Sequence, residues 1–224
     1  MVQAKKENAT MAPTTRKALT AGVLGLLFLS AGCATQSGQA SEVTRTMTSM
    51  QTARHELVKV RDRVDEVLGA MDRLHAASAG SLPWVYKVFT DQVAQTVRQS
   101  GTARRRTSGM LAQWRQYVAS WKREIGRLST PELRAGAAER RQTALHNYER
   151  LRDAAGATEQ AFPPFLTQLR DIQKSLSLDL TPPGVRVAQP VFEQARESGA
   201  ELKRAITAFI AQIDQVTAVS PPRK

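Results

Sequence analysis

Apolar side chains that recur every three or four residues constrain this sequence more than any other feature. The pattern begins at Val43 and continues to about Val219, and no clear alternation of apolar and polar residues predicts a strand. A spacing of three and four places these side chains on one face of a helix, where they form an apolar stripe for a neighbouring helix. The sequence therefore predicts an all-α chain.

Four long helices are expected, because Pro and Gly residues interrupt the pattern at a few places only. The first covers residues 42–77, the second begins near Pro83, the third begins near Pro131, and the fourth ends near Val219. The clearest stripe belongs to the fourth helix and consists of Ala195, Gly199, Leu202, Ile206, Phe209, Ile213 and Val216. Short connections place successive helices side by side. We expect one domain over residues 42–219, an elongated antiparallel bundle with coiled-coil-like packing.

Local signals refine the helix boundaries. Ser129 and Glu132 have the spacing of a capping box, with Pro131 in the first turn of the third helix. Pro163 and Pro164 are expected to kink or break that helix, because proline lacks the backbone N–H and its ring clashes with the preceding turn. Residues 178–184 are typical of a connection, and residues 220–224 of a tail. Gly residues at 101 and 109 leave open whether the second helix bends there.

The first 32 residues have the layout of an export signal. Arg16 and Lys17 precede an apolar run of residues 18–29, and small residues follow. A membrane-spanning helix would need about 20 apolar residues, so this run is too short to be one. The small residues lead directly to Cys33, the only cysteine of the chain. This stretch resembles a bacterial lipoprotein lipobox, which implies that residues 1–32 are removed and that Cys33 is lipidated.

Several details of this N-terminal segment bear on its processing. By the sorting preference of lipoproteins, Ala34 after the cysteine implies the outer membrane. Met11 is an alternative start, in which case residues 1–10 are not translated. An ordinary cleaved signal with a cysteine near the cut remains the alternative to lipidation. Residues 33–41 are small and polar, and we expect them to form a flexible tether.

Three stretches of the mature chain resemble an uncharacterised family of bacterial proteins, a domain of unknown function. They are Pro131-Glu-Leu-Arg134 with Glu139-Arg-Arg141, residues 162–166, and residues 169–184. The resemblance covers about residues 43–219. It implies a helical, secreted or lipid-anchored protein of the cell envelope, and it supplies no activity and no site residues.

Composition argues against catalytic and metal sites. One Cys and three His residues leave little for a metal site, and a single Cys cannot form an intramolecular disulfide. His55, His75 and His146 lie in unrelated helical segments, and no Gly-rich phosphate loop occurs. We therefore expect no catalytic residues, no metal and no cofactor.

A strongly basic charge is the one clear indication of a partner. Lys and Arg number 32 against 20 Asp and Glu, which gives a net charge of +12. The candidate contacts on the second and third helices are Arg104, Arg105, Arg106, Arg140 and Arg141. If those helices pack antiparallel, the two clusters could approach one another and attract anionic lipid head groups or wall polymers. The alternative is a solvated face that keeps the bundle soluble.

These observations predict a lipid-anchored cell-envelope protein, at the outer membrane and facing the periplasm, with a structural or protein-interaction role. Two alternatives stay open: a cationic binder of anionic envelope polymers or lipids, and an envelope enzyme or enzyme regulator whose site is not visible in the sequence. The expected partners are the membrane, through the anchor, and an envelope protein or an anionic polymer. A second copy of the chain is a further candidate. Nucleic acid is not expected, because the chain is exported and has no base-reading motif.

Overall fold

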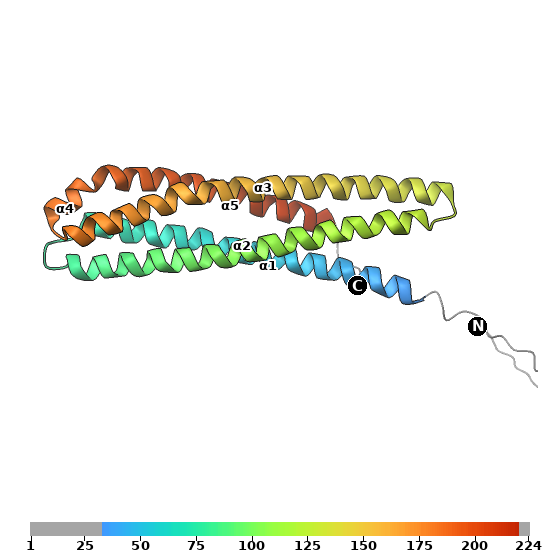
Figure 1. The fold of residues 1–224 in the computed structure, drawn as a ribbon, viewed down its shortest axis with the longest axis horizontal. Helices are drawn as coiled ribbons and strands as arrows, with labels where there is room; N and C mark the ends of the chain where they lie inside the picture. The colour runs from blue at the N-terminus through green and yellow to red at the C-terminus, as the bar shows by residue number, and fades with distance from the viewer. Residues whose placement is uncertain (1–32, 220–224) are drawn as a thin grey trace, which may run out of the picture.

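The computed structural model describes residues 33–219 of the chain. They form α1 (Cys33–His75), α2 (Leu82–Gly126), α3 (Pro131–Leu178), the short α4 (Pro182–Val187) and α5 (Gln189–Val219). The four long helices form an elongated antiparallel bundle (Figure 1). Between residues 33 and 219 the chain forms no strand. The predicted fold class is confirmed, whereas the expected export signal and tail, residues 1–32 and 220–224, lie outside the described residues.

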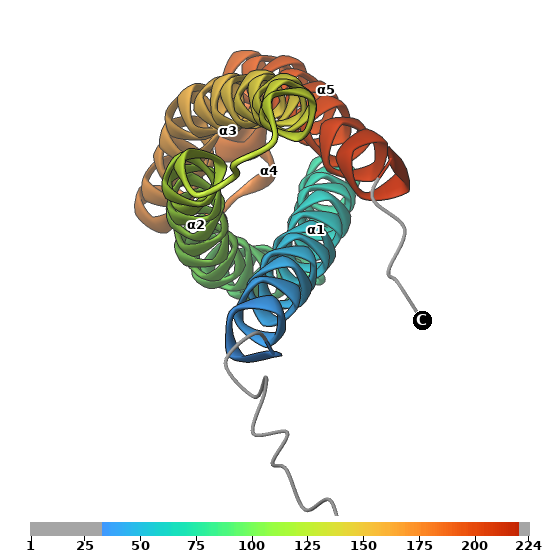
Figure 2. The ribbon, with the colours of Figure 1, turned by 90° about the vertical axis from the view of Figure 1, so that its right-hand side faces the viewer.

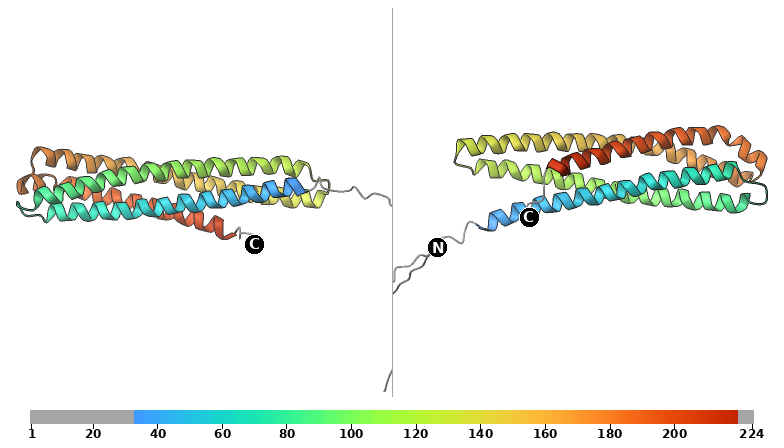
Figure 3. Two further views of the ribbon diagram at one scale, coloured as in Figure 1. Left: turned by 90° about the horizontal axis from the view of Figure 1, so that it is seen from below. Right: turned by 180° about the vertical axis from the view of Figure 1, so that it is seen from behind.

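Each long helix packs along two others. The order around the bundle is α1, α2, α3 and α5, so α5 closes the ring against α1 (Figure 2). The views from below and from behind show that α2 and α3 extend beyond the C-terminal end of α5 (Figure 3). The N-terminal end of α1 and the α2–α3 connection lie at one end of the bundle, and α4 lies at the other (Figure 1).

The core consists mostly of aliphatic side chains, together with four phenylalanines. Every member of the stripe that the sequence predicts on the last helix is buried. The fully buried phenylalanines are Phe89, Phe165, Phe192 and Phe209. Burial of apolar area on the inner faces of four helices therefore supplies the main stabilisation of the bundle.

Three ion pairs join α1 to α5. The guanidinium of Arg54 donates to both carboxylate oxygens of Asp214, at 2.6 and 3.1 Å, and this interaction raises the pKa of Arg54. Lys203 pairs with Asp65, and Arg196 lies 2.7 Å from Asp72. Steps of 11 and 7 residues along α1 are matched by equal steps backward along α5. Both spacings return to the same face of a helix, so the three pairs share one antiparallel register.

Two expected features near helix starts differ in the structure. Helix α1 begins at Cys33, so residues 33–41, expected to be a flexible tether, are part of the helix. Helix α3 begins at Pro131 as predicted, but its N-cap is Thr130, whose side chain makes no capping hydrogen bond. Glu132 is then one position too early to close a capping box. The guanidinium of Arg134 donates instead to the Leu128 carbonyl oxygen, at 2.7 Å and 3.2 Å.

The expected break at Pro163 and Pro164 does not occur, because α3 continues through both prolines. The two rings are exposed, whereas Phe165 beside them is fully buried against the core. We infer that this burial compensates for the backbone hydrogen bonds that the prolines cannot make. Helix α2 is likewise one continuous helix through both of its internal glycines.

The connection after α3 is more ordered than its composition indicates. Asp179 follows the helix and accepts a hydrogen bond of 2.7 Å from the Thr181 hydroxyl. That hydroxyl oxygen in turn accepts from the backbone N–H of Gly184, at 3.2 Å, and caps α4. A Cβ on Gly184 would lie 2.2 Å from the Asp179 carbonyl oxygen, so this turn requires glycine.

Replacement of two helical glycines by alanine should have opposite effects on stability. A Cβ at Gly199 of α5 would lie 3.0 Å from Phe165 Cε2 and 3.2 Å from Leu68 Cδ1, whereas one at Gly109 would have no neighbour within 4 Å. We expect Gly199→Ala to lower the free energy of unfolding by about 1–3 kcal/mol through overpacking. Gly109→Ala should raise it by about 0.5–1 kcal/mol. Urea denaturation followed by circular dichroism measures both, and stabilisation by Gly199→Ala would contradict the close packing.

Candidate functional site

The three consecutive arginines of α2 point to different sides of the helix. The Arg104 side chain reaches α3, where its Nη2 atom lies 2.5 Å from Glu159 Oε1. Arg105 and Arg106 instead line a groove between α1 and α2. A rotation of about 100° per residue in an α-helix separates neighbouring side chains in this way. Helix α2 therefore contributes arginine side chains to two different grooves.

The first groove, called the α1–α2 groove, has a volume of about 490 Å³ and is basic. Its lining contains the guanidinium groups of Arg45, Arg105 and Arg106 and no carboxylate. None of these three arginines has an ion-pair partner among the described residues. The remaining lining residues are Thr44, Thr48, Ser49, Thr52, Gly109, Met110 and Gln113. Three guanidinium groups that have no carboxylate partner, beside hydroxyl and amide groups, can bind an anion such as phosphate.

Local sequence explains why the α1–α2 groove is open and basic. Thr44, Thr48 and Thr52 recur every four residues on α1, so short side chains face the groove. Gly109 of α2 has no side chain to fill it. The Arg105 guanidinium is held on this helix by donation to Thr102 Oγ1, at 3.1 Å. Small residues on two adjacent helices thus leave a groove open, and arginine side chains lie along its edges.

Arg140 and Arg141 lie elsewhere on the bundle. The Nε atom of Arg141 donates to the Val118 carbonyl oxygen of α2, at 3.3 Å, and Arg140 is exposed. Residue 118 is about 20 Å along α2 from Arg104, at 1.5 Å per residue. The two arginine clusters therefore do not form one continuous surface, although α2 and α3 pack antiparallel as expected.

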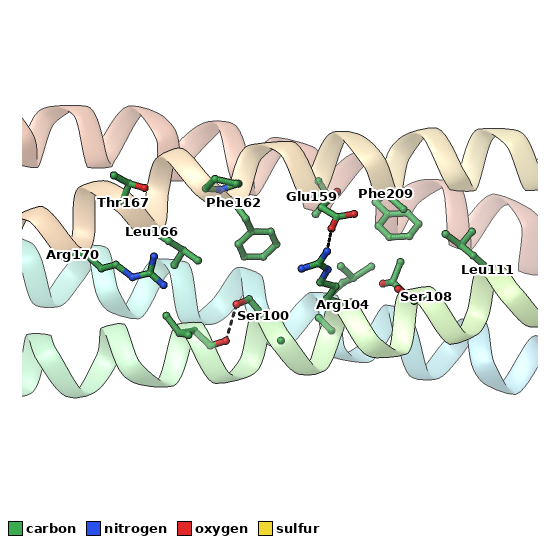
Figure 4. A pocket seen from close by; sticks show the side chains of 18 residues that line it. Ser100, Arg104, Ser108, Leu111, Glu159, Phe162, Leu166, Thr167, Arg170 and Phe209 are labelled. Carbon is green, nitrogen blue, oxygen red and sulfur yellow. Dashed lines mark hydrogen bonds and ion pairs between the residues drawn. The ribbon is translucent and has the colours of Figure 1, made fainter.

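The second groove, called the α2–α3 groove, has a volume of about 550 Å³ and is more apolar (Figure 4). Its apolar residues are Leu57, Val97, Ala103, Leu111, Ala155, Phe162, Pro163, Leu166 and Phe209. The Arg104–Glu159 ion pair connects the two helices across the groove, and Arg170 lies toward one end (Figure 4). Hydroxyl groups of Ser100, Thr107, Ser108, Thr158 and Thr167 complete its polar part.

Sequence reasoning missed the α2–α3 groove, although one signal could have indicated it. The segment from Ser100 to Gly109 on α2 is rich in small residues, and the facing part of α3 contains Ala154, Ala155 and Ala161. Small residues on two facing helices cannot fill the space between them unless the backbones approach closely. Whether these two segments lie opposite one another depends on the register of α2 against α3, which the composition of each segment does not specify.

Aromatic residues near the end of α2 stabilise the bundle. Trp114 is buried, and its Nε1 atom donates to the Ala144 carbonyl oxygen of α3, at 3.1 Å. The Tyr117 ring contacts Trp114 and Trp121 edge to face, with centroid distances of 6.2 and 5.3 Å. Burial raises the pKa of Tyr117. The three rings are therefore packing groups, in contact with one another and, through Trp114, with α3.

The described residues contain no cluster that could bind a metal ion. His55, His75 and His146 are all exposed, and no group of three His, Cys, Asp or Glu side chains between residues 33 and 219 could hold a metal ion. The carboxyl group of Glu56 has a lowered pKa because Lys59 and Gln99 donate hydrogen bonds to it, which is a structural contact between α1 and α2. No helix in the described part of the chain has the length and hydropathy to cross a membrane.

Residues 41–219 match the model of a family described as "Protein of unknown function (DUF2959)". The match begins within α1 and ends with α5, so it covers nearly the whole described bundle. The resemblance to a domain of unknown function is thereby confirmed. Neither the curated proteins nor the solved structures contain a match.

Replacement of Arg104, Arg105 and Arg106 together by Gln should leave the bundle folded. All three side chains are exposed, and the Arg104–Glu159 pair has side-chain exposures of 74% and 58%. An exposed ion pair contributes about 0–1 kcal/mol, so we expect a loss of stability of about 1 kcal/mol or less. Far-ultraviolet circular dichroism and thermal unfolding measure the effect. Loss of helicity at room temperature would contradict the placement of these side chains on the outside.

Proposed function

The chain belongs to the DUF2959 family, whose function is unknown, and we propose that it is a non-catalytic binding protein of the cell envelope. A lipid on Cys33 holds it at the outer membrane, facing the periplasm. Its partner is an anionic envelope polymer that carries phosphate groups, and the α1–α2 groove is the contact. Of the functions expected from the sequence, this is the first alternative, a cationic binder of anionic envelope polymers, rather than the structural or protein-interaction role.

The charge of the α1–α2 groove carries this proposal. Arg45, Arg105 and Arg106 come from two helices and border one groove that has no carboxylate in its lining. Arginine suits phosphate because its planar guanidinium can donate two parallel hydrogen bonds to two oxygens. The neighbouring Thr, Ser and Gln side chains are suitable partners for the hydroxyl groups of a sugar.

The position of Cys33 supports an anchor at one end of the bundle. Cys33 is the first residue of α1, at the end where α2 and α3 are connected (Figure 1). A lipid there would leave α4 about 65 Å away, at 1.5 Å per residue of α1. Arg45 lies only about 18 Å along α1 from Cys33. The α1–α2 groove would therefore begin close to the membrane surface.

A protein partner is a second candidate, favoured by the opposite end of the bundle. Trp84, Leu178 and Val187 are large apolar residues with exposures of 66%, 82% and 76%. They belong to the first turn of α2 and to the last residues of α3 and α4, which lie far from Cys33 (Figure 1). Binding through such residues would be insensitive to salt, in contrast to binding through guanidinium groups.

The anchor is tested by mass spectrometry of the protein purified from its native membrane fraction. We expect a mature chain that begins at Cys33 and carries additional acyl mass. The Cys33→Ser variant should lose this mass and leave the membrane fraction. An unmodified chain that retains residues 11–32 in the soluble cytoplasm would contradict the proposal, and the +12 charge would then make nucleic acid the leading candidate partner.

The groove is tested by binding of polyphosphate, a phosphate polymer without acyl chains. We expect the variant Arg45→Gln/Arg105→Gln/Arg106→Gln to bind at least about tenfold more weakly than the unchanged protein, because each guanidinium makes charge-assisted hydrogen bonds. Added salt should weaken binding to the unchanged protein steeply. Calorimetric titration at two salt concentrations measures both effects.

The matched control is Arg73→Gln/Lys174→Gln/Arg186→Gln, which removes the same charge from exposed residues outside both grooves. We expect it to weaken binding only slightly. An equal loss in both variants would show that net charge alone attracts the polymer. No binding by the unchanged protein would also contradict the proposal.

A further inference from the structure

We propose that the α2–α3 groove binds a single-chain amphipath with an anionic head group, such as a fatty acid. This ligand is a small molecule at a site separate from the α1–α2 groove, so the inference does not depend on the polymer partner. Three features of the groove support this proposal together: its apolar lining, the guanidinium of Arg170, which has no ion-pair partner among the described residues, and the ion pair that crosses it.

The apolar lining suits a hydrocarbon chain. Phe162 and Leu166 of α3 project into the space between the helices, Leu111 of α2 lies at one end, and Phe209 of α5 lies between Glu159 and Leu111 in this view (Figure 4). Leu57 of α1 completes the floor. The volume of about 550 Å³ lies within the range of about 300–1,000 Å³ that is common for small-molecule pockets. Each methylene group of the ligand that leaves water here makes binding more favourable.

Arg170 supplies the charge for the head group. It lies at the end of the groove opposite Leu111, and its guanidinium points into the space between α2 and α3 (Figure 4). It has no ion-pair partner among the residues that the structure describes. A carboxylate or phosphate at this end can accept two hydrogen bonds from one guanidinium, while the chain extends along the apolar residues toward Leu111.

The Arg104–Glu159 ion pair can open to let such a ligand enter the groove. It connects α2 and α3 across the groove between Phe162 and Leu111, so a bound chain would pass behind it (Figure 4). Both side chains are more than half exposed, and an exposed ion pair contributes little to stability. The free energy lost when this pair opens is therefore small compared with the free energy gained when a hydrocarbon chain is buried.

The acyl chains of the proposed anchor are not the occupant. Leu57 in the floor of the groove lies about 36 Å along α1 from Cys33. The hydrocarbon core of a bilayer is about 30 Å thick, so an acyl chain of one leaflet extends about half that distance. The ligand is therefore a separate molecule.

The test is calorimetric titration of the full chain carrying Cys33→Ser, so that no attached lipid competes. Two probes with the same hydrocarbon chain are compared, the anionic dodecanoate and the neutral dodecanol. We expect Arg170→Gln to weaken dodecanoate binding at least about tenfold and to leave dodecanol binding unchanged. Ala155→Leu, which adds atoms to the lining, should weaken the binding of both probes.

Two variants serve as matched controls. Lys174→Gln removes the same charge one turn further along α3, and Ala112→Leu adds the same atoms at an exposed position of α2; neither residue lines the groove. Both should bind dodecanoate as the unchanged protein does. Equal weakening by Lys174→Gln and Arg170→Gln would overturn the role of Arg170. Unchanged binding in Ala155→Leu, or no binding of dodecanoate at all, would overturn the site itself.

Discussion

The antiparallel register of α1 against α5 is the constraint on which the rest of the bundle depends. These helices come from opposite ends of the described chain, and their contact closes the ring of four. Apolar stripes alone would tolerate a slide of α5 by two helical turns, because the stripe repeats at that spacing. The ion pairs of Arg54, Asp65 and Asp72 with α5 favour a single register. Each contributes little energy, so we infer that they select the register while apolar burial supplies the stability.

This register also determines the floor of the α2–α3 groove. Leu57 of α1 and Phe209 of α5 both line that floor, and they lie close to the same antiparallel alignment as the ion pairs. A slide of α5 would replace Phe209 by a different residue and change the shape of the cavity. The surface ion pairs between α1 and α5 are thus coupled to the shape of the α2–α3 groove on the other side of the bundle.

Some features of this molecule depend on spacing within one helix, and the sequence predicted those well. The buried stripe of α5 and the start of α3 at Pro131 follow from local periodicity and proline chemistry. The predicted capping box does not form, because the N-cap is Thr130 and not Ser129, as the spacing to Glu132 requires. The predicted break at Pro163 does not occur. We infer that the burial of Phe165, a tertiary contact, outweighs the local tendency of proline to end a helix. The grooves depend on which small residues face one another across two helices, and periodicity within one helix does not specify that.

One short segment of α2 borders both grooves, yet the two binding proposals can be separated. Arg104 belongs to the α2–α3 groove, whereas Arg105 and Arg106 belong to the α1–α2 groove. A change in this triplet therefore alters both at once. Arg45 on α1 and Arg170 on α3 each line one groove only, and the bundle lies between them. An effect of Arg45 on polymer binding and of Arg170 on amphipath binding would show two independent sites, whereas crossed effects would require coupling through α2.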